Sequence, residues 1–240
     1  MSEKVDILAI GAHPDDIELG CGGTLMKEIE MGKKVGLMDL TQGELGTRGS
    51  KEIRKQEAEL ARDFMGAKFR DNLLLDDCFF ENNRDNQIKL ISKIRRYQPD
   101  IIMCNATDDR HIDHQKAAKL VVDSCFLSGL KKIETTFDGN IQDVWRPVNV
   151  YHYIQWKNLE PDFVIDISKY MKQKFDLINC YKSQFYNDEK FDDNTPISTK
   201  NFLDSITYRA RDLGRLVGVE AAEGFLSSRF PIVDRISGLK

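Results

Sequence analysis

Residues 5–24 read VDILAIGAHPDDIELGCGGT, and this segment opens with an apolar run from Val5 to Ile10 that only Asp6 interrupts. Such a run predicts a buried strand. The strand should end near Gly11, where the sequence changes to a loop rich in polar and acidic side chains. In a doubly wound parallel sheet, ligands bind just beyond the carboxyl ends of the strands. The loop after this strand is therefore the first candidate for a functional site.

This loop carries residues that are suited to binding a metal ion. His13 supplies an imidazole nitrogen and Asp16 a carboxylate oxygen, a combination that suits zinc or another divalent ion. Pro14 biases His13 away from a helical conformation, so His13 can lie at the strand end and Asp16 in the following turn. Asp15 cannot easily share the direction of Asp16, and we expect it to face the open position of the metal. One of the two aspartates could instead be a helix N-cap, and this alternative stays open.

Strands and helices alternate along the chain, which predicts an α/β fold with a mostly parallel sheet flanked by helices. We expect further strands at 34–40, 68–75, 100–104, 148–154 and 162–167, and helices at 24–32, 50–65, 85–97, after His114, and at 168–181 and 201–216. The expected buried face of the 50–65 helix consists of Ile53, Leu60, Ala61 and Phe64. Residues 185–196 are polar and predict a surface loop. No repeat or linker divides the chain, so residues 1–240 should form a single domain with a less regular C-terminal portion.

A second polar cluster follows the strand expected at 100–104, and it reads NATDDRHIDH from Asn105 to His114. Three of the four histidines lie in the two strand-end loops, which should open onto the same edge of the sheet. His111 and His114 are three residues apart, so in a helical first turn they can point the same way, one to a metal and one to a substrate. Asp113 is placed to orient a histidine through its second ring nitrogen.

Residues 41–49, TQGELGTRG, contain three glycines and should form one wall of the site, with charges from Glu44 and Arg48. Arg54 follows in the first turn of the next helix and is a candidate substrate anchor, although an arginine on a helix is more commonly solvated. Asp39, just before this loop, is also compatible with a nucleotide-binding protein. Against that reading, the first turn lacks Gly-x-Gly-x-x-Gly, and its carboxylates would repel a pyrophosphate.

The composition narrows the classes of function. A formal net charge of -4 without a basic stripe argues against a nucleic-acid partner. No apolar run reaches the ~20 residues that span a bilayer, and the chain begins without a signal-peptide core, so we expect a cytoplasmic protein without a membrane partner. The five scattered cysteines predict reduced thiols, and Cys21 should be a packing residue. His152, in an apolar run, should be a packed histidine rather than a ligand.

The string Ala12-His13-Pro14-Asp15-Asp16-x-Glu18, together with His111-x-Asp113-His114, resembles the two-part signature of the PIG-L/LmbE-like N-acetylglucosamine deacetylases. The resemblance extends through most of the chain, including the Gly43–Gly49 loop. Members of this family are zinc-dependent amidases with a Rossmann-like fold, which implies the same fold and Zn²⁺, or another divalent ion, for this chain. Its length and the Asp-Arg-His-x-Asp-His form of its second motif are most similar to the bacillithiol-pathway branch, which deacetylates N-acetylglucosaminyl malate.

The resemblance also implies roles for individual residues. The metal ligands of the family match His13, Asp16 and His114; its general base matches Asp15, and the group that stabilises the oxyanion matches His111. We expect Asp15 to take the proton of the attacking water and pass it to the amine, while Asp113 holds a protonated His111. In the mycothiol-pathway relatives, a tyrosine shortly before the histidine pair helps to bind the intermediate, but here Asp109 and Arg110 occupy that neighbourhood.

The leading hypothesis is a hydrolase that removes the acetyl group from a small-molecule N-acetylglucosaminide, with Glu44, Arg48 and Arg54 as candidate substrate contacts. One alternative is a general N-acetyl sugar deacetylase of the chitooligosaccharide type, and a less favoured one is a nucleotide-dependent oxidoreductase. A binding protein without turnover is a further alternative, but Asp15 is not needed as a ligand and argues against it. The sequence does not identify the aglycone or the metal that is bound in the cell. It also leaves the oligomeric state open, and a homo-oligomer is one alternative.

Overall fold

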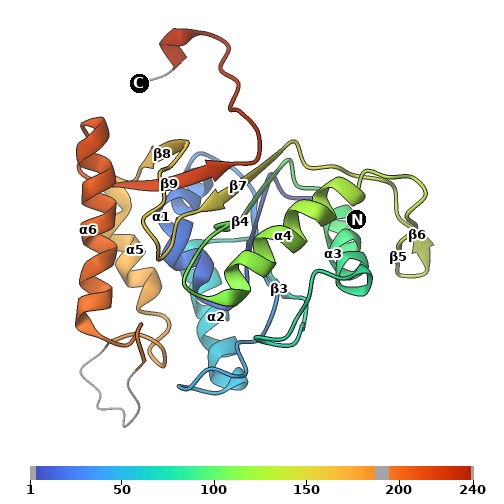
Figure 1. Cartoon of the computed structure of the whole chain (residues 1–240), viewed down its shortest axis with the longest axis horizontal. Helices are drawn as coiled ribbons and strands as arrows, with labels where there is room; N and C mark the ends of the chain where they lie inside the picture. The colour runs from blue at the N-terminus through green and yellow to red at the C-terminus, as the bar shows by residue number, and fades with distance from the viewer. Residues whose placement is uncertain (1–3, 187–194, 239–240) are drawn as a thin grey trace.

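The computed structural model describes residues 4–186 and 195–238 and confirms the mostly parallel α/β fold. Within these residues, a seven-stranded sheet has the strand order β3-β2-β1-β4-β7-β9-β8 (Figure 1). Its strands are β1 (Ile7–Gly11), β2 (Val35–Asp39), β3 (Arg70–Asn72), β4 (Ile101–Asn105), β7 (Asn149–Tyr153), β8 (Phe163–Asp166) and β9 (Ala222–Ser227). All neighbours from β3 to β7 pair in parallel, whereas β9 runs antiparallel to both β7 and β8. A separate hairpin consists of β5 (Thr136–Phe137) and β6 (Asn140–Ile141).

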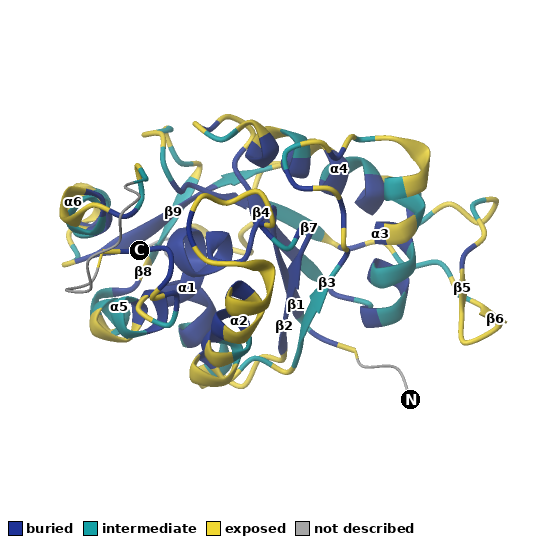
Figure 2. Ribbon diagram, turned by 90° about the horizontal axis from the view of Figure 1, so that it is seen from below, coloured by how far each residue is buried: buried dark blue, intermediate teal, exposed yellow. Residues whose placement is uncertain are grey.

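Helices cover both faces of the sheet, as Figure 2 shows from below. They are α1 (Asp16–Glu30), α2 (Lys51–Met65), α3 (Arg84–Tyr97), α4 (Ile112–Leu127), α5 (Met171–Ile178) and α6 (Lys200–Val217), with 3₁₀ turns at Ser168–Tyr170 and Ile236–Gly238. Side chains of β1 alternate between two cores: Ile7 and Ala9 pack with α1 and α2, and Leu8 and Ile10 pack with α3 and α4. Because both faces are covered, β1 and β2 are buried throughout, which explains their apolar sequences.

α1 begins at Asp16, well before the start that we predicted, so Gly20, Gly22 and Gly23 belong to the helix, which has a kink at Cys21. A Cβ atom on Gly20 would lie 2.1 Å from the Tyr153 ring, so this glycine permits close packing against β7. Just after the kink, the buried carboxylate of Glu223 accepts hydrogen bonds from two backbone N–H groups. These tertiary partners outweigh the low helix propensity of glycine.

α2 has the predicted limits, but of the four residues of the predicted buried face only Ala61 is buried. Three of its expected core side chains are 45–59% exposed: Ile53, Leu60 and Phe64. The helix instead buries Arg54 and Glu57 with Ala58, Ala61 and Met65. Glu57 accepts hydrogen bonds from the N–H and hydroxyl of Ser183, and Arg54 has partners in the site described below. Hydrogen-bonded polar groups therefore face inward on this helix.

The C-terminal portion differs most from the prediction. The antiparallel strand β9 was not predicted, and it lies between β7 and β8. The helix expected at 168–181 begins as a 3₁₀ turn and ends at Ile178. In the N-terminal half, the strand expected at 68–75 is limited to Arg70–Asn72. Most of the loop expected at 185–196 lies outside the described residues. Among the described residues, no helix is both long and apolar enough to cross a membrane.

Candidate active site

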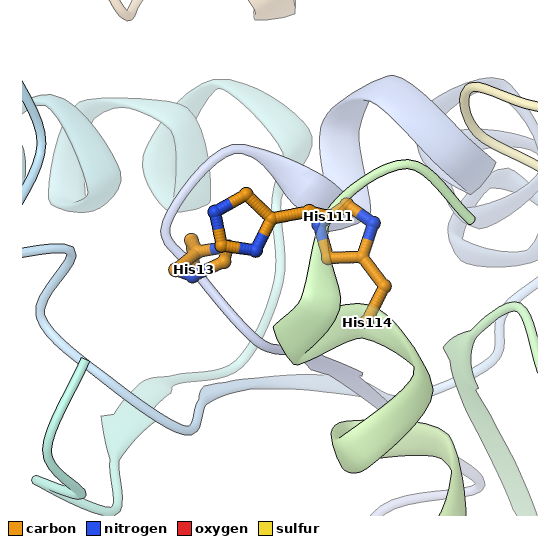
Figure 3. A group of neighbouring side chains, drawn as sticks. All are labelled: His13, His111 and His114. Carbon is orange, nitrogen blue, oxygen red and sulfur yellow. The ribbon is translucent and has the colours of Figure 1, made fainter. Parts of the chain in front are cut away.

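The carboxyl ends of β1 and β4 bring the two ligand-rich loops together, as predicted. Figure 3 shows the imidazoles of His13, His111 and His114 gathered where the loop after β1 meets the start of α4. The ring centroids of His13 lie 4.5 Å from His111 and 5.7 Å from His114. Parallel pairing of β1 with β4 explains this contact between segments about a hundred residues apart.

Asp16 lies between two of these histidines. Its Oδ1 is 3.1 Å from Nε2 of His114, and its Oδ2 is 3.5 Å from Nδ1 of His13. Two amides hold the carboxylate: Asn105 Nδ2 donates to Oδ2 at 3.0 Å, and Gln155 Nε2 donates to Oδ1 at 2.7 Å. Burial by itself would raise the pKa of Asp16, but the charge of His114 and hydrogen bonds from both histidines lower this pKa well below its ordinary value.

In both His13 and His114, the ring nitrogen that does not face Asp16 contacts a carboxylate. His114 Nδ1 lies 2.7 Å from Asp109 Oδ2, and His13 Nε2 lies 3.1 Å from Asp77 Oδ1 and 3.3 Å from Asp113 Oδ2. Metal-binding histidines are usually oriented by carboxylates in this way. The histidine that the Asp113 carboxylate contacts is therefore His13, and our expectation that it holds His111 is wrong.

Two groups of described residues bring possible metal ligands together, with ligand atoms within 4.8 Å of one another. One consists of His13, His111 and His114, and the other of His13, Asp77 and Asp113. The ligand set that we predicted shares two histidines with the first group, and Asp16 reaches these two with different oxygens. Imidazole nitrogens with a carboxylate suit zinc and similar divalent ions, so the residues present fit such an ion.

Asp15 occupies the N-cap position of α1 but forms no side-chain cap hydrogen bond, so the capping alternative is wrong for this residue. Its φ of 116° is unusual for a residue other than glycine, and such backbone conformations concentrate at functional sites. The buried carboxylate contacts Arg54, whose Nη2 lies 3.2 Å from Oδ2. Burial raises the pKa of Asp15 to about 7, and the charge of Arg54 acts in the opposite direction.

His111 precedes α4 and lines a cavity whose wall also includes His13, Asp15 and Asp16. Its Nδ1 accepts a hydrogen bond of 3.3 Å from the backbone N–H of Asp113, so in the neutral ring the proton lies on Nε2. Burial and the charges of His13 and His114 lower the pKa of His111 to about 4. Our expectation of a protonated His111 at neutral pH is therefore not supported.

The three candidate substrate contacts have partners within the protein. Arg54 donates to the carbonyl oxygens of Pro14 at 2.6 Å and Gly43 at 3.2 Å, as well as to Asp15, and it lines the cavity. Glu44 accepts hydrogen bonds from the backbone N–H groups of Asp77 and Gln42. The side chain of Arg48 is buried, and its carbonyl oxygen accepts a hydrogen bond from Gln184. From the glycine-rich loop, the cavity wall includes Leu45, Gly46 and Thr47.

The cavity around these groups has a volume of about 180 Å³. Sequence reasoning missed Asp77 and Gln155 in this region, and it assigned no role to Asn105 or Arg110 although both lie in the second polar cluster. Asp77 follows β3, so its place beyond a third parallel strand is a signal that could have found it. Gln155 follows β7, but nothing in the local sequence distinguishes it from an ordinary surface amide. A larger cavity of about 890 Å³ adjoins this one and shares Trp156, Pro196 and Phe202 with it.

Other candidates from the sequence lie outside this chemistry. His152 is buried, with Nδ1 2.8 Å from the carbonyl oxygen of Asn105 and Nε2 3.2 Å from Ser228 Oγ, which confirms it as a packed histidine. All five cysteines are free thiols, and burial raises the pKa of Cys21 well above its ordinary value, so it is not a reactive thiol.

Asp39 is not available to a nucleotide ribose. Both of its carboxylate oxygens accept hydrogen bonds of 2.7 Å from Arg70, whose remaining Nη1 donates to Glu18. All three side chains are buried or nearly so. This ion-pair cluster occupies the group on which the oxidoreductase alternative depended, so Asp39 no longer supports that alternative.

Comparisons with known proteins agree with the geometry. The profile of the PIG-L family, GlcNAc-PI de-N-acetylase, matches residues 8–125. The chain is 26% identical to a diacetylchitobiose deacetylase of Thermococcus kodakarensis over 76% of this chain and 71% of that protein. It is 35% identical to an uncharacterized deacetylase of Escherichia coli over 47% of this chain and 64% of that protein. Among solved structures, the conserved protein TT1542 from Thermus thermophilus superposes with a TM-score of 0.86 at 30% identity, covering 97% of this chain and 98% of that one.

The family profile covers both motif loops, and the Thermus relative matches nearly the whole chain. A 4-oxalmesaconate hydratase of Pseudomonas putida is also similar, with 24% identity over 74% of this chain and 73% of that protein. The family profile and the diacetylchitobiose deacetylase support an enzyme that hydrolyses an amide on a sugar of the N-acetylglucosamine type. The chain therefore belongs to the PIG-L/LmbE family of deacetylases.

Proposed function

We propose that this protein is a zinc-dependent N-deacetylase that acts on a small N-acetylglucosaminide. The observation that carries the proposal is the position of Asp16 between His13 and His114, while the neighbouring Asp15 points separately toward Arg54. Two imidazoles and one carboxylate are a common ligand set of catalytic zinc and leave one position for water. The second carboxylate then remains for proton transfer.

A bound zinc ion would lower the pKa of water and polarise the acetyl carbonyl. Asp15 takes the proton of the water as its oxygen bonds to the acetyl carbon. The same residue returns the proton to the nitrogen as the C–N bond breaks, which yields acetate and a free amine. Burial supports this role, because it raises the pKa of Asp15 to about 7, and a base with a pKa near the working pH is well matched to both transfers.

His111 stabilises the oxyanion as a neutral hydrogen-bond donor in this proposal. Its Nδ1 is occupied by the N–H of Asp113, which leaves Nε2–H for the developing charge on the acetyl oxygen. Asp109 acts only through His114, which it orients, and Asp77 and Asp113 act only through His13.

For the substrate we propose N-acetylglucosaminyl malate, as in bacillithiol biosynthesis. The acidic cavity would repel an anionic aglycone unless a cation lay nearby, and Arg110 meets this need. Its exposed guanidinium lies 4.4 Å from the centre of the Trp156 ring at the cavity wall and forms no ion pair within the described residues. Arginine can bind a carboxylate through two parallel hydrogen bonds.

A second candidate is a general deacetylase of chitooligosaccharides. The adjoining cavity of about 890 Å³ favours it, because a second sugar could extend there past Trp156. One experiment separates these candidates: the release of free amine from N-acetylglucosaminyl malate, N-acetylglucosamine and diacetylchitobiose, before and after treatment with a chelator and after zinc is restored. We expect chelator-sensitive release with a preference for the malate compound. Preference for diacetylchitobiose would support the second candidate, and no release from any substrate would refute the deacetylase proposal.

A further inference from the structure

The 41–49 loop, which is rich in glycine, and the loop after β3 are joined by two reciprocal hydrogen bonds. Asp77 Oδ2 accepts from the N–H of Leu45 at 3.0 Å, and Glu44 Oε1 accepts from the N–H of Asp77 at 2.9 Å. These two bonds run in opposite directions between Asp77 and the adjacent residues Glu44 and Leu45. They therefore fix both the backbone and the side chain of Asp77 relative to the glycine-rich loop.

The other oxygen of Asp77 faces a histidine of the site. Oδ1 lies 3.1 Å from His13 Nε2, and Asp113 Oδ2 lies 3.3 Å from the same nitrogen. The three side chains are buried together. A neutral imidazole carries a single N–H, and two carboxylates place that proton on Nε2. The lone pair of His13 is then on Nδ1, which is the nitrogen that faces Asp16.

The two carboxylates are anchored differently. Asp113 belongs to α4, and its oxygens accept hydrogen bonds from the N–H of Cys78 at 2.8 Å and from Lys116 Nζ at 3.2 Å. Asp77 is bound to Leu45, and Leu45 itself lines the cavity. The contact between His13 and the 41–49 loop therefore runs through Asp77, whereas Asp113 contacts the loop after β3 through Cys78.

We propose that Asp77 is a positioning residue that couples the conformation of the 41–49 loop to the metal-binding nitrogen of His13. The inference rests on the metal site proposed above. A metal ion that fixes His13 should also order the loop, and by thermodynamic linkage a ligand that orders the loop should strengthen metal binding. Asp77 transmits the effect because its two oxygens contact the two partners separately.

His13, Asp77 and Asp113 could alternatively bind a second cation, because their ligand atoms lie within 4.8 Å of one another. The ammonium group of Lys116 already lies 3.2 Å from Asp113 Oδ1, and its charge opposes a second cation there. We therefore expect one zinc ion per chain.

The test compares Asp77→Asn with Asp76→Asn, a matched control at the exposed neighbouring residue. An asparagine whose oxygen still accepts from the N–H of Leu45 presents its NH₂ group to His13 Nε2. This group opposes the ring N–H and leaves Asp113 alone to hold the proton on Nε2. Zinc affinity is measured by competition with a chromophoric chelator, and hydrogen exchange of residues 42–48 is measured with and without saturating zinc. We expect zinc to slow this exchange in the wild type and in Asp76→Asn. In Asp77→Asn, zinc affinity should fall roughly 10- to 100-fold, and saturating zinc should no longer slow the exchange.

Glu44→Ala provides a second variant that leaves His13 and its two carboxylates untouched. It removes the hydrogen bond from the Asp77 N–H, one of the two that join the loops. We therefore expect zinc to slow exchange of the 41–49 loop less than in the wild type. Equal zinc affinity in Asp77→Asn and Asp76→Asn would overturn the coupling while leaving the proposed function intact. Loss of a second zinc equivalent in Asp77→Asn would also overturn it, in favour of a cation site. A wild-type protein that binds no zinc would refute both the coupling and the proposed function.

Discussion

Nη2 of Arg54 lies 3.2 Å from Oδ2 of Asp15, and both side chains are buried. The same guanidinium donates to the carbonyl oxygens of Pro14 and Gly43, so it joins α2 to the loops on both sides of the site. These contacts make Arg54 a partner of the proposed general base. They also leave the buried Nε of Arg54 without a hydrogen-bond partner among the described residues, so a direct contact with substrate remains a prediction.

Arg54→Ala should shift the acidic limb of kcat/KM to higher pH. Burial raises the pKa of Asp15, and the charge of Arg54 lowers it, so removing that charge raises the pKa further. Because Asp15 must be ionised to accept a proton, activity is then lost at a higher pH than in the wild type. Arg54→Lys keeps the charge and should largely restore the limb. The pH profiles of the three zinc-loaded proteins provide the measurement, and an identical limb in all three would rule out this influence on Asp15.

Arg110→Ala should raise KM for N-acetylglucosaminyl malate much more than for N-acetylglucosamine. Hydrogen bonds to a charged group are worth about 1.5–3 kcal/mol, so kcat/KM for the malate compound should fall on the order of ten- to a hundred-fold. Arg146→Ala is a suitable control, because Arg146 is also exposed and lies over an aromatic ring, that of Phe126. Equal losses on the two substrates would show that Arg110 serves the sugar. A selective loss in Arg54→Ala instead would identify Arg54 as the anchor.

His111→Ala should lower kcat without changing an alkaline limb of the pH profile. Burial and the neighbouring histidine charges lower the pKa of His111 to about 4, so the ring is already neutral at pH 7 and has no charge to lose as the pH rises. A bound cation shifts this pKa in the same direction. Loss of one oxyanion donor typically costs about 10²–10³-fold in kcat. An alkaline limb that is present in the wild type and absent from His111→Ala would show that the protonated histidine is required.

Asp15→Asn should retain zinc and lose most of its turnover, because the change removes a proton acceptor and not a ligand. General base catalysis is typically worth about 10²–10⁴-fold, and kcat should fall by that order. Asp108→Asn is the control: Asp108 is exposed, paired with Lys157, and should be dispensable. A value of kcat in Asp15→Asn close to that of the wild type would mean that another group is the base.

The sequence predicted those parts of the site that follow directly from strand ends. Apolar runs ending at Gly11 and Asn105 locate two neighbouring parallel strands, and the polar residues that follow them must lie at one edge of the sheet. The proximity of His13 to His111 and His114 follows from this topology alone. No long-range information about side chains was needed.

Other parts depend on contacts that periodicity does not encode. Ile53 and Leu60 have the spacing of a core face, yet α2 turns Arg54 and Glu57 inward because these polar groups find partners on other segments. The contact of Asp113 with His13 rather than His111 likewise depends on how α4 meets the loop after β1. The strand β9 was missed because it pairs antiparallel between two strands that precede it by many residues.

The central claim is that His114, with His13 and Asp16, holds the metal while His111 serves the substrate. His111 and His114 lie one helical turn apart, and their ring centroids are separated by 5.3 Å. The competing ligand set is the group of His13, His111 and His114. The zinc content per chain of purified His114→Ala and His111→Ala, measured by elemental analysis, distinguishes the two sets. We predict that His114→Ala loses the ion and that His111→Ala retains one equivalent. Full zinc in His114→Ala, or loss of zinc from His111→Ala, would contradict this account.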